Sequence, residues 1–317
     1  MAITIGGGIT IGSGMSFTPR RSIVTDGLLL NFDAATYTGQ QTGTQQNVSG
    51  TSDNIGFFPY GWDNPPPTGF SNIQPGWFCV QTGAVVTAVD AGSHVITTTG
   101  TPFTSGSSYT FIGPWIDGVS SVHATPYNSP SWSSDNGGTF ILSQPSAQYF
   151  SVPWPTFQPT FTIDIWFNFT GNQPGAACLI SDEFSGAPFN FTINAAQSYL
   201  QTGWYTTNWG GQYATNGTPT ALTSDGSTWY NIVMAVGPTN YKDYINGSVS
   251  YDPGSFSAIG AAPPNGSSPT QKFYIGHRWD LLETVNAKMA VVNIYNRALT
   301  DQEVAQNYNY YKSRFGL

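Results

Sequence analysis

The sequence predicts an all-β fold, an antiparallel β-sandwich with one helix at its C-terminal end. Short apolar or alternating runs recur along most of the 317 residues, Gly-, Pro- and Asn-rich turns separate them, and only one stretch has helical spacing. Aromatic residues make up 15% of the chain, which supplies apolar surface for a core although only 8% of the residues are charged. Many short strands with one terminal helix are typical of a sandwich.

Residues 1–25 are predicted to form an extended N-terminal arm. Two Ile-Thr-Ile-Gly copies alternate apolar with small or polar residues, which places Ile3, Ile5, Ile9 and Ile11 along one extended segment. Such a segment is too short and too rich in glycine to fold by itself. Its unpaired backbone groups favour addition to a sheet edge during assembly, and a disordered tail is the alternative.

The sandwich is predicted over residues 26–40 and 128–317. It opens on the buried run Asp26-Gly-Leu-Leu-Leu-Asn-Phe-Asp33. From Phe161 to Phe169 every odd position is Ile or Phe and faces the core, whereas Thr162, Asp164, Trp166 and Asn168 face the other way. Asn246-Gly247 lies between two strand-like runs and predicts a two-residue hairpin.

Residues 41–127 are predicted to form a β-rich insertion or small subdomain. The stretch 40–75 is rich in turn residues, and 77–112 contains short apolar or alternating runs split by glycine-containing turns.

The helix is predicted to begin after Thr300. Thr300 and Glu303 form a capping box, and an apolar stripe then recurs at spacings of four, three and four residues through Val304, Tyr308, Tyr311 and Phe315. Lys312 and Arg314 complement the helix dipole, and Gly316 ends the helix.

Charge excludes two classes of partner. The chain has 9 basic and 17 acidic residues, and no Lys or Arg lies between Arg21 and Lys242. Nucleic-acid binding needs several basic contacts to phosphate, so we expect none, and no polybasic membrane contact. No apolar run is long enough for membrane insertion. Cys79 and Cys178 are expected to be buried thiols, and whether they meet is left open.

The strand motifs occur in a familiar order. They are Gly27-Leu-Leu-Leu-Asn-Phe-Asp-Ala34, Asn136-Gly-Gly-Thr-Phe-Ile-Leu142, Phe161-Thr-Ile-Asp-Ile-Trp-Phe167, Trp229-Tyr-Asn-Ile-Val233, Tyr274-Ile-Gly276 and Ile294-Tyr-Asn-Arg-Ala-Leu-Thr300. This series resembles the concanavalin A-like, laminin-G-type jelly-roll domains, which include the pentraxins. The resemblance covers residues 26–40 and 128–317, and its last motif is the most specific.

The resemblance implies a structural protein of a tailed-bacteriophage virion, because such domains are common there and often follow a Gly/Ile/Thr arm. The first reading is a homo-oligomeric capsid decoration protein whose arm contacts other virion proteins. The alternative is a tail-associated adhesin that binds host-surface glycan. The start of the chain lacks a signal-peptide pattern, which fits a virion protein assembled in the host cytoplasm.

Catalysis is not expected, although the resembling fold includes glucanases. Those enzymes carry Glu-x-Asp-x-Glu on one strand, because glycoside hydrolysis uses two carboxylates that flank the scissile bond. The glutamates here are Glu183, Glu283 and Glu303, so that motif is absent. The three histidines, at positions 94, 123 and 277, have no metal-ligand spacing.

No cofactor is expected, and calcium is left open because several relatives of the resembling family bind it. The candidate ligands are the adjacent acids Asp182 and Glu183, together with Asp225 and Asp280. Solvated loop acids are the alternative interpretation.

Glycan binding is the predicted site function. One short glycine-flanked stretch offers exposed aromatic faces beside amide groups, a combination that suits carbohydrate, and Trp279 is expected on a nearby loop. The candidates are Trp204, Tyr205, Asn208, Trp209 and Trp279. The alternative is that these aromatic residues pack against loops or a neighbouring subunit.

Overall fold

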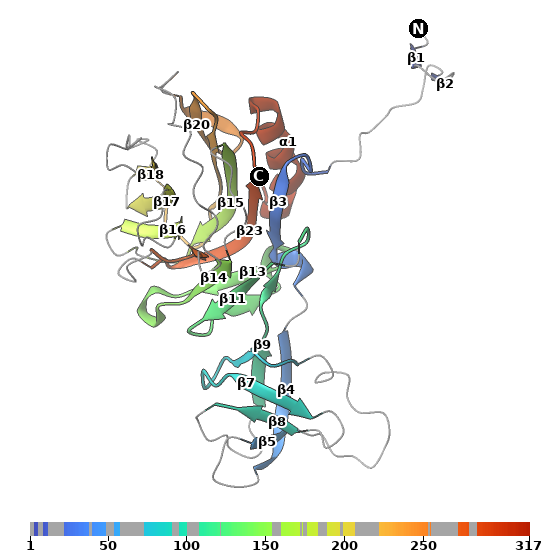
Figure 1. Cartoon of the computed structure of the whole chain (residues 1–317), viewed down its shortest axis with the longest axis vertical. Helices are drawn as coiled ribbons and strands as arrows, with labels where there is room; N and C mark the ends of the chain where they lie inside the picture. Colours follow the sequence, from blue (N-terminus) through green and yellow to red (C-terminus); the bar gives the residue numbers. More distant parts are fainter. Residues whose placement is uncertain are drawn as a thin grey trace.

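The computed structural model describes most of the sandwich, part of the insertion and two short N-terminal strands. The described residues are 3–5, 9–11, 22–37, 40–48, 54–57, 73–90, 95–99, 108–120, 122–153, 160–171, 173, 176–182, 189–196, 199–206, 222–252, 254, 272–278 and 284–317. They form two large antiparallel sheets, a smaller sheet and a separate two-stranded hairpin (Figure 1).

The first large sheet has seven strands. Their spatial order is β10 (Trp115–Ile116), β11 (His123–Tyr127), β14 (Tyr149–Pro153), β22 (Lys272–Ile275), β16 (Ala176–Asp182), β17 (Phe189–Ala196) and β18 (Tyr199–Thr206). Two central pairings bring together strands far apart in the sequence, because β22 lies between β14 and β16.

The second large sheet has eight strands. Seven follow one another in the order β12 (Ser131–Ser133), β13 (Thr139–Leu142), β23 (Ala287–Tyr295), β15 (Phe161–Phe169), β19 (Trp229–Val236), β20 (Tyr241–Ile245) and β21 (Ser248–Tyr251), and β3 (Leu28–Asp33) pairs with β23. At the β20–β21 turn both Asn246 and Gly247 have positive φ, which confirms the predicted two-residue hairpin.

The main core lies between these two sheets. Ile163, Ile165 and Phe167 of β15 point into it, as the alternation predicts, and meet inward residues of the other sheet such as Phe150 and Ile275. These side chains are fully buried. An antiparallel β-sandwich with one α-helix among the described residues is therefore confirmed.

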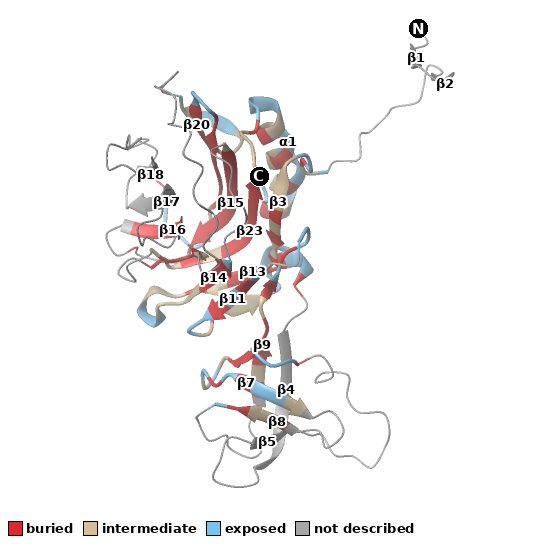
Figure 2. Cartoon of the chain, viewed as in Figure 1, coloured by how far each residue is buried: buried red, intermediate tan, exposed pale blue. Residues whose placement is uncertain are grey.

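The outer face of the eight-stranded sheet is covered by α1 (Asp301–Tyr311) and the 3₁₀ turn η4 (Lys312–Phe315). Both hydrogen bonds of the predicted capping box are present. The Trp166 ring stacks on Phe315 at 4.6 Å between centroids. Because the helix covers this face, every residue of β15 is buried on both sides of the sheet (Figure 2).

A buried carboxylate lies beneath the helix. Asp164 accepts hydrogen bonds from the side-chain amides of Asn231 (2.7 Å), Asn293 (3.2 Å) and Asn307 (3.1 Å). Burial raises the pKa of Asp164, and the three amide hydrogen bonds oppose that rise. The residues are contributed by three strands and the helix, so the network joins α1 to the sheet.

The insertion forms a six-stranded sheet of its own, drawn below the sandwich in Figure 1. Its strands are β6 (Phe78–Cys79), β9 (Ser108–Ile112), β4 (Gln40–Val48), β5 (Asn54–Phe57), β8 (Val95–Thr98) and β7 (Val86–Asp90), in spatial order. A small cluster around Trp77, Val86 and Phe111 forms its core.

The predicted insertion boundary at residue 127 differs from the observed pairing, because β10 (Trp115–Ile116) and β11 (His123–Tyr127) pair within the sandwich. Trp115 is fully buried in the main core and contacts Phe32, Phe140 and Phe150. Sequence alternation cannot distinguish a strand of the insertion from the strand that returns to the sandwich.

The N-terminal segment has two described parts, a hairpin and residues 22–25, which contact α1 and which we name the N-terminal root. β1 (Ile3–Ile5) pairs with β2 (Ile9–Ile11), so Ile3 lies opposite Ile11 and Ile5 opposite Ile9. Addition of this segment to another sheet edge stays a prediction. Val24, which the prediction places in the arm, is buried against α1, and its amide N–H donates to Asn307 Oδ1 at 2.8 Å.

Two further observations complete the fold. Cys79 and Cys178 are both buried thiols, as expected, and neither is part of a disulfide. No helix in the described part of the chain has the length and hydrophobicity needed to cross a membrane. The remaining 3₁₀ turns are η1 (Ala34–Thr36), η2 (Asp135–Gly137) and η3 (Gln144–Ser146).

Candidate functional site

The outer face of the seven-stranded sheet carries the candidate site. In β14 and β22 the alternation sends Phe150, Phe273 and Ile275 into the main core. Tyr149 and Tyr274 therefore point to the opposite side, and both are partly exposed.

A group of four rings lies on this face, and we name Tyr127, Tyr149, Tyr274 and His277 the tyrosine cluster. Tyr127 and Tyr149 are directly paired across β11 and β14, and their rings are parallel, with an interplanar angle of 2° and centroids 4.7 Å apart. Tyr149 also meets Tyr274 edge-on at 5.6 Å and His277 at 4.7 Å. Tyr127 is 39% exposed, so the stack is open to solvent at its end.

The base of the cluster is held by a glycine turn after β22. Gly276 has a φ of +89°, and a Cβ at this position would lie 2.3 Å from Leu142 Cδ1. The turn brings the His277 ring, which is 1% exposed, beneath Tyr149. The Ser181 hydroxyl donates to the His277 carbonyl at 3.1 Å, which ties this turn to β16.

The position of Tyr149 in the cluster affects the pKa of its hydroxyl. Partial burial raises the pKa of the Tyr149 hydroxyl, and the neighbouring Tyr127 adds to the rise. Tyr149 therefore stays protonated at neutral pH and can both donate and accept hydrogen bonds. Aromatic faces beside neutral hydroxyls can bind the apolar faces and hydroxyl edges of a sugar.

The sequence-predicted site residues lie partly on the same sheet. Trp204 and Tyr205 belong to β18, where they pair with Phe191 and Asn190 of β17. Asn208, Trp209 and Trp279 lie outside the described residues, although Trp279 follows closely on His277 and Arg278 in the chain. Contact of these five residues with glycan stays a prediction.

The tyrosine cluster itself is missed by sequence reasoning. Its members lie on strands separated by up to 150 residues, and only the order β11-β14-β22 makes them neighbours. The available signal is the alternation of Tyr149-Phe-Ser-Val152, which predicts an outward Tyr149 but not the partners beside it.

The calcium candidates are only partly described. Asp225 Oδ1 accepts from the backbone N–H groups of Ser227 (2.8 Å) and Thr228 (2.7 Å), and its Oδ2 accepts from the Thr228 hydroxyl (2.6 Å). These hydrogen bonds lower the pKa of Asp225 and account for it as a turn residue. Among the side chains that the structure describes, no three His, Cys, Asp or Glu residues gather around a metal-sized space. The side chains of Asp182, Glu183 and Asp280 lie outside the described set.

The two facing sheets, with one covered and one aromatic outer face, define a lectin-like β-sandwich. The chain belongs to the concanavalin A-like lectin/glucanases superfamily, whose laminin G model matches residues 143–305, about half of the chain. No curated protein sequence matches significantly.

Solved structures give distant matches. The receptor-binding domain of a botulinum neurotoxin of mosaic serotype C/D is 12% identical, with a TM-score of 0.47 and coverage of 61% of this chain and 47% of that one. Trypanosoma rangeli sialidase, solved with the inhibitor DANA, is 16% identical, with a TM-score of 0.44 and coverage of 62% and 30%. Domain 4 of the arabinanase AbnA from Geobacillus stearothermophilus, in complex with arabinotriose, is 14% identical, with a TM-score of 0.46 and coverage of 61% and 92%. Identities and TM-scores this low carry no functional information about this chain.

Proposed function

We propose that this chain is a non-catalytic surface protein of a tailed-phage virion that contacts host-surface glycan through the outer face of its seven-stranded sheet. The observation that supports glycan contact is the tyrosine cluster, in which three partly or fully exposed tyrosine rings pack together over the buried His277 ring. The virion setting is supported by the sequence resemblance alone.

The chemistry of the cluster favours carbohydrate over a charged ligand. An aromatic ring covers the C–H face of a pyranose, whereas the phenol hydroxyls bond its hydroxyl edge. The parallel pair Tyr127–Tyr149 and the perpendicular Tyr274 offer two ring orientations within 5.6 Å of each other. A charge-poor surface of this kind suits binding by contact area and hydroxyl hydrogen bonds.

The burial of two carboxylates in the eight-stranded sheet also supports a binding role rather than catalysis. Asp164 lies beneath α1 in its amide network, and Asp243 of β20 accepts from the Tyr241 hydroxyl at 2.5 Å. Both carboxylates are fully buried. Two buried carboxylates in the eight-stranded sheet are not placed to flank a glycosidic bond at the tyrosine cluster.

The second candidate function is capsid decoration, in which the N-terminal arm attaches the sandwich to the particle. The observation that favours it is the Ile-Thr-Ile hairpin, which pairs within itself and belongs to neither large sheet. Decoration and glycan contact are compatible, because one uses the arm and the other the far side of the sandwich.

The proposed glycan binding is tested by the double variant Tyr127→Ala/Tyr149→Ala on a glycan array. Binding should fall at least about tenfold, since two aromatic contacts are removed. Tyr310→Ala, at an exposed position of α1, is the matched control and should bind normally. Trp204→Ala with Trp209→Ala tests the stretch chosen from the sequence. Wild-type binding by the cluster variant, with an unchanged melting temperature, would exclude the tyrosine cluster.

The virion setting is tested by immunogold labelling of purified phage particles with an antibody against the sandwich. Gold over the head supports decoration, whereas gold at the tail supports the adhesin. Deletion of residues 1–21 should then release the protein from particles while the sandwich stays folded, because the deletion spares the root at Val24. Particles without gold, or full attachment after the deletion, would contradict the respective role.

A further inference from the structure

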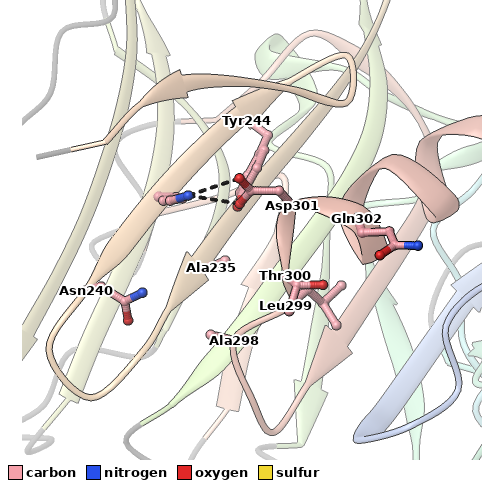
Figure 3. Close-up of a pocket in the computed structure, with 9 residues that line it drawn as sticks. Ala235, Asn240, Tyr244, Ala298, Leu299, Thr300, Asp301 and Gln302 are labelled. Carbon is pink, nitrogen blue, oxygen red and sulfur yellow. Dashed lines mark hydrogen bonds and ion pairs between the residues drawn. The ribbon is translucent and has the colours of Figure 1, made fainter. Parts of the chain in front are cut away.

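The outer face of the eight-stranded sheet is hollowed at one end. On β19 the outward residues Trp229 and Val233 are buried by the helical segment and the side chains around it. Ala235 is the next outward residue, and it is buried in the same cluster as Leu299 and Val304. The small alanine side chain leaves an open groove there of about 490 Å³, within the size range of small-molecule sites (Figure 3).

The groove has an apolar floor and two walls. Ala235, Ala298 and Leu299 supply the apolar lining. The strand β20 forms one wall, because Lys242 pairs with Ala235 in the sheet register. The chain from Ala298 to Gln302 forms the other wall, and Figure 3 shows Asn240 and Thr300 on opposite sides of Ala235.

The second wall is fixed in place rather than being a loose loop. The Thr162 hydroxyl on β15 donates to the Arg297 carbonyl at 2.8 Å and accepts from the Leu299 N–H at 2.9 Å. The Arg297 guanidinium also bonds both oxygens of Glu303, at 2.7 and 2.8 Å. A wall held from both sides offers a preformed site, so little ordering is needed on binding.

The charges in the groove are matched among themselves. Lys242 Nζ donates to the two oxygens of Asp301 at 2.9 and 3.1 Å and lies 3.4 Å from Asp252. The Tyr244 hydroxyl donates to Asp301 Oδ1 at 2.7 Å. The ammonium is thus already neutralised by carboxylates, and the carboxylate by its donors. This arrangement offers no free cationic group to a phosphate or a carboxylate.

The walls of the groove carry neutral hydrogen-bonding groups. The exposed amide of Asn240 can donate and accept at the same time, and Gln302 provides a second amide at the opposite wall. Amides with this double capacity match hydroxyl groups, which also donate and accept. An apolar floor beneath amide rims matches the apolar face and hydroxyl edge of one sugar ring.

We infer that the groove between β20 and residues 298–302 is a second carbohydrate site, which binds a neutral hexose residue. It lies on the sheet opposite the tyrosine cluster, so one sandwich holds two glycan contacts on opposite faces. The inference rests on the proposed glycan-binding function and extends it to two sites. Two contacts on one chain raise the strength of attachment to a dense glycan surface.

The test is saturation-transfer NMR on the full chain, with glucose, galactose and mannose as probes and glucose 6-phosphate as the charged probe. Ala298→Trp fills the groove and should abolish transfer to the hexose that binds. Asn240→Ala removes one wall amide from an exposed position and should weaken binding about fivefold, as the loss of one neutral hydrogen bond does. Ser313→Trp, at an exposed position of η4, is the matched control and should behave as the wild type.

The double variant Tyr127→Ala/Tyr149→Ala separates the two sites. Transfer that persists in this variant and disappears in Ala298→Trp supports the groove, even where the tyrosine cluster fails on the glycan array. The inference is overturned by hexose transfer that survives Ala298→Trp, by stronger binding of glucose 6-phosphate than of glucose, or by a folded wild type that binds none of the hexoses. If hexose transfer is lost in Tyr127→Ala/Tyr149→Ala but kept in Ala298→Trp, the second site is excluded and the proposed function still stands.

Discussion

The outer faces of the two large sheets have the same alternating pattern and opposite surroundings. On β15, Thr162, Asp164 and Trp166 point away from the main core and are completely buried, because α1, η4 and the segment that precedes α1 cover them. On β14 and β22, Tyr149 and Tyr274 also point away from the main core, but they lie in an exposed tyrosine cluster.

The difference shows that the element packed on a sheet decides the role of its outer residues. Beneath α1, polar groups must be hydrogen-bonded to one another, as in the network of Asp164 with its three asparagine amides. At the tyrosine cluster the side chains of Tyr127, Tyr149 and Tyr274 are exposed or partly exposed. Four predictions test this contrast.

The largest expected effect comes from Trp166→Ala. The Trp166 ring stacks on Phe315 at 4.6 Å and on Tyr308 at 5.6 Å, so the variant leaves a cavity beneath the helix. We expect the free energy of unfolding to fall by about 4 kcal/mol. The matched change on the open face, Tyr274→Ala, should cost about 1 kcal/mol. Urea unfolding measures both, and equal losses would contradict the contrast.

The next effect comes from Asn307→Leu, which breaks the link between the N-terminal root and the sheet. Asn307 accepts from the Val24 N–H at 2.8 Å and donates to Tyr295 and Asp164, at 2.8 and 3.1 Å. We expect a loss of about 3 kcal/mol, because buried groups are left unsatisfied. Proteolysis near residue 22 should also become faster. Thr125→Val, on the exposed face of β11, serves as the control and should change stability by less than about 0.5 kcal/mol.

The pH dependence of Asp164 has a defined sign. Its pKa is raised in the folded state by burial, so the ionised carboxylate costs stability at pH values above that pKa. The cost is relieved as the pH falls through the folded pKa. We therefore expect the stability of the wild type minus that of Asp164→Asn to increase on acidification, as measured by urea unfolding over a pH series. A difference that stays constant or decreases would show that the pKa of Asp164 is not raised.

The smallest expected effect on stability is that of Glu303→Gln. The pKa of Glu303 is lowered in the folded state, whereas that of Asp164 is raised. Hydrogen bonds from Arg297, and then from Thr300, lower the pKa of Glu303 to about 2. Its contribution is complete above the unfolded pKa of 4.5 and is lost as the pH falls from there towards 2. Glu303→Gln should therefore cost about 1 kcal/mol at neutral pH and almost nothing at the acid end. Thermal melts at several pH values test this, and a loss that grows on acidification would contradict it.

The sequence by itself determined the local features of this protein. The capping box of Thr300 and Glu303, the turn at Asn246-Gly247 and the inward residues of β15 depend on spacing within a few residues, and spacing is written in the chain. The class of the fold follows from the sum of such signals.

Tertiary structure alone decided which strands became neighbours and what covered each sheet. The tyrosine cluster needs β11, β14 and β22 side by side, and the groove needs residues 298–302 to pass beside Ala235 and Lys242. The return of β10 and β11 to the sandwich and the burial of Val24 against α1 depend on the same long-range packing. Alternation fixes the side of a strand on which a residue lies, but it carries no information about the element on that side.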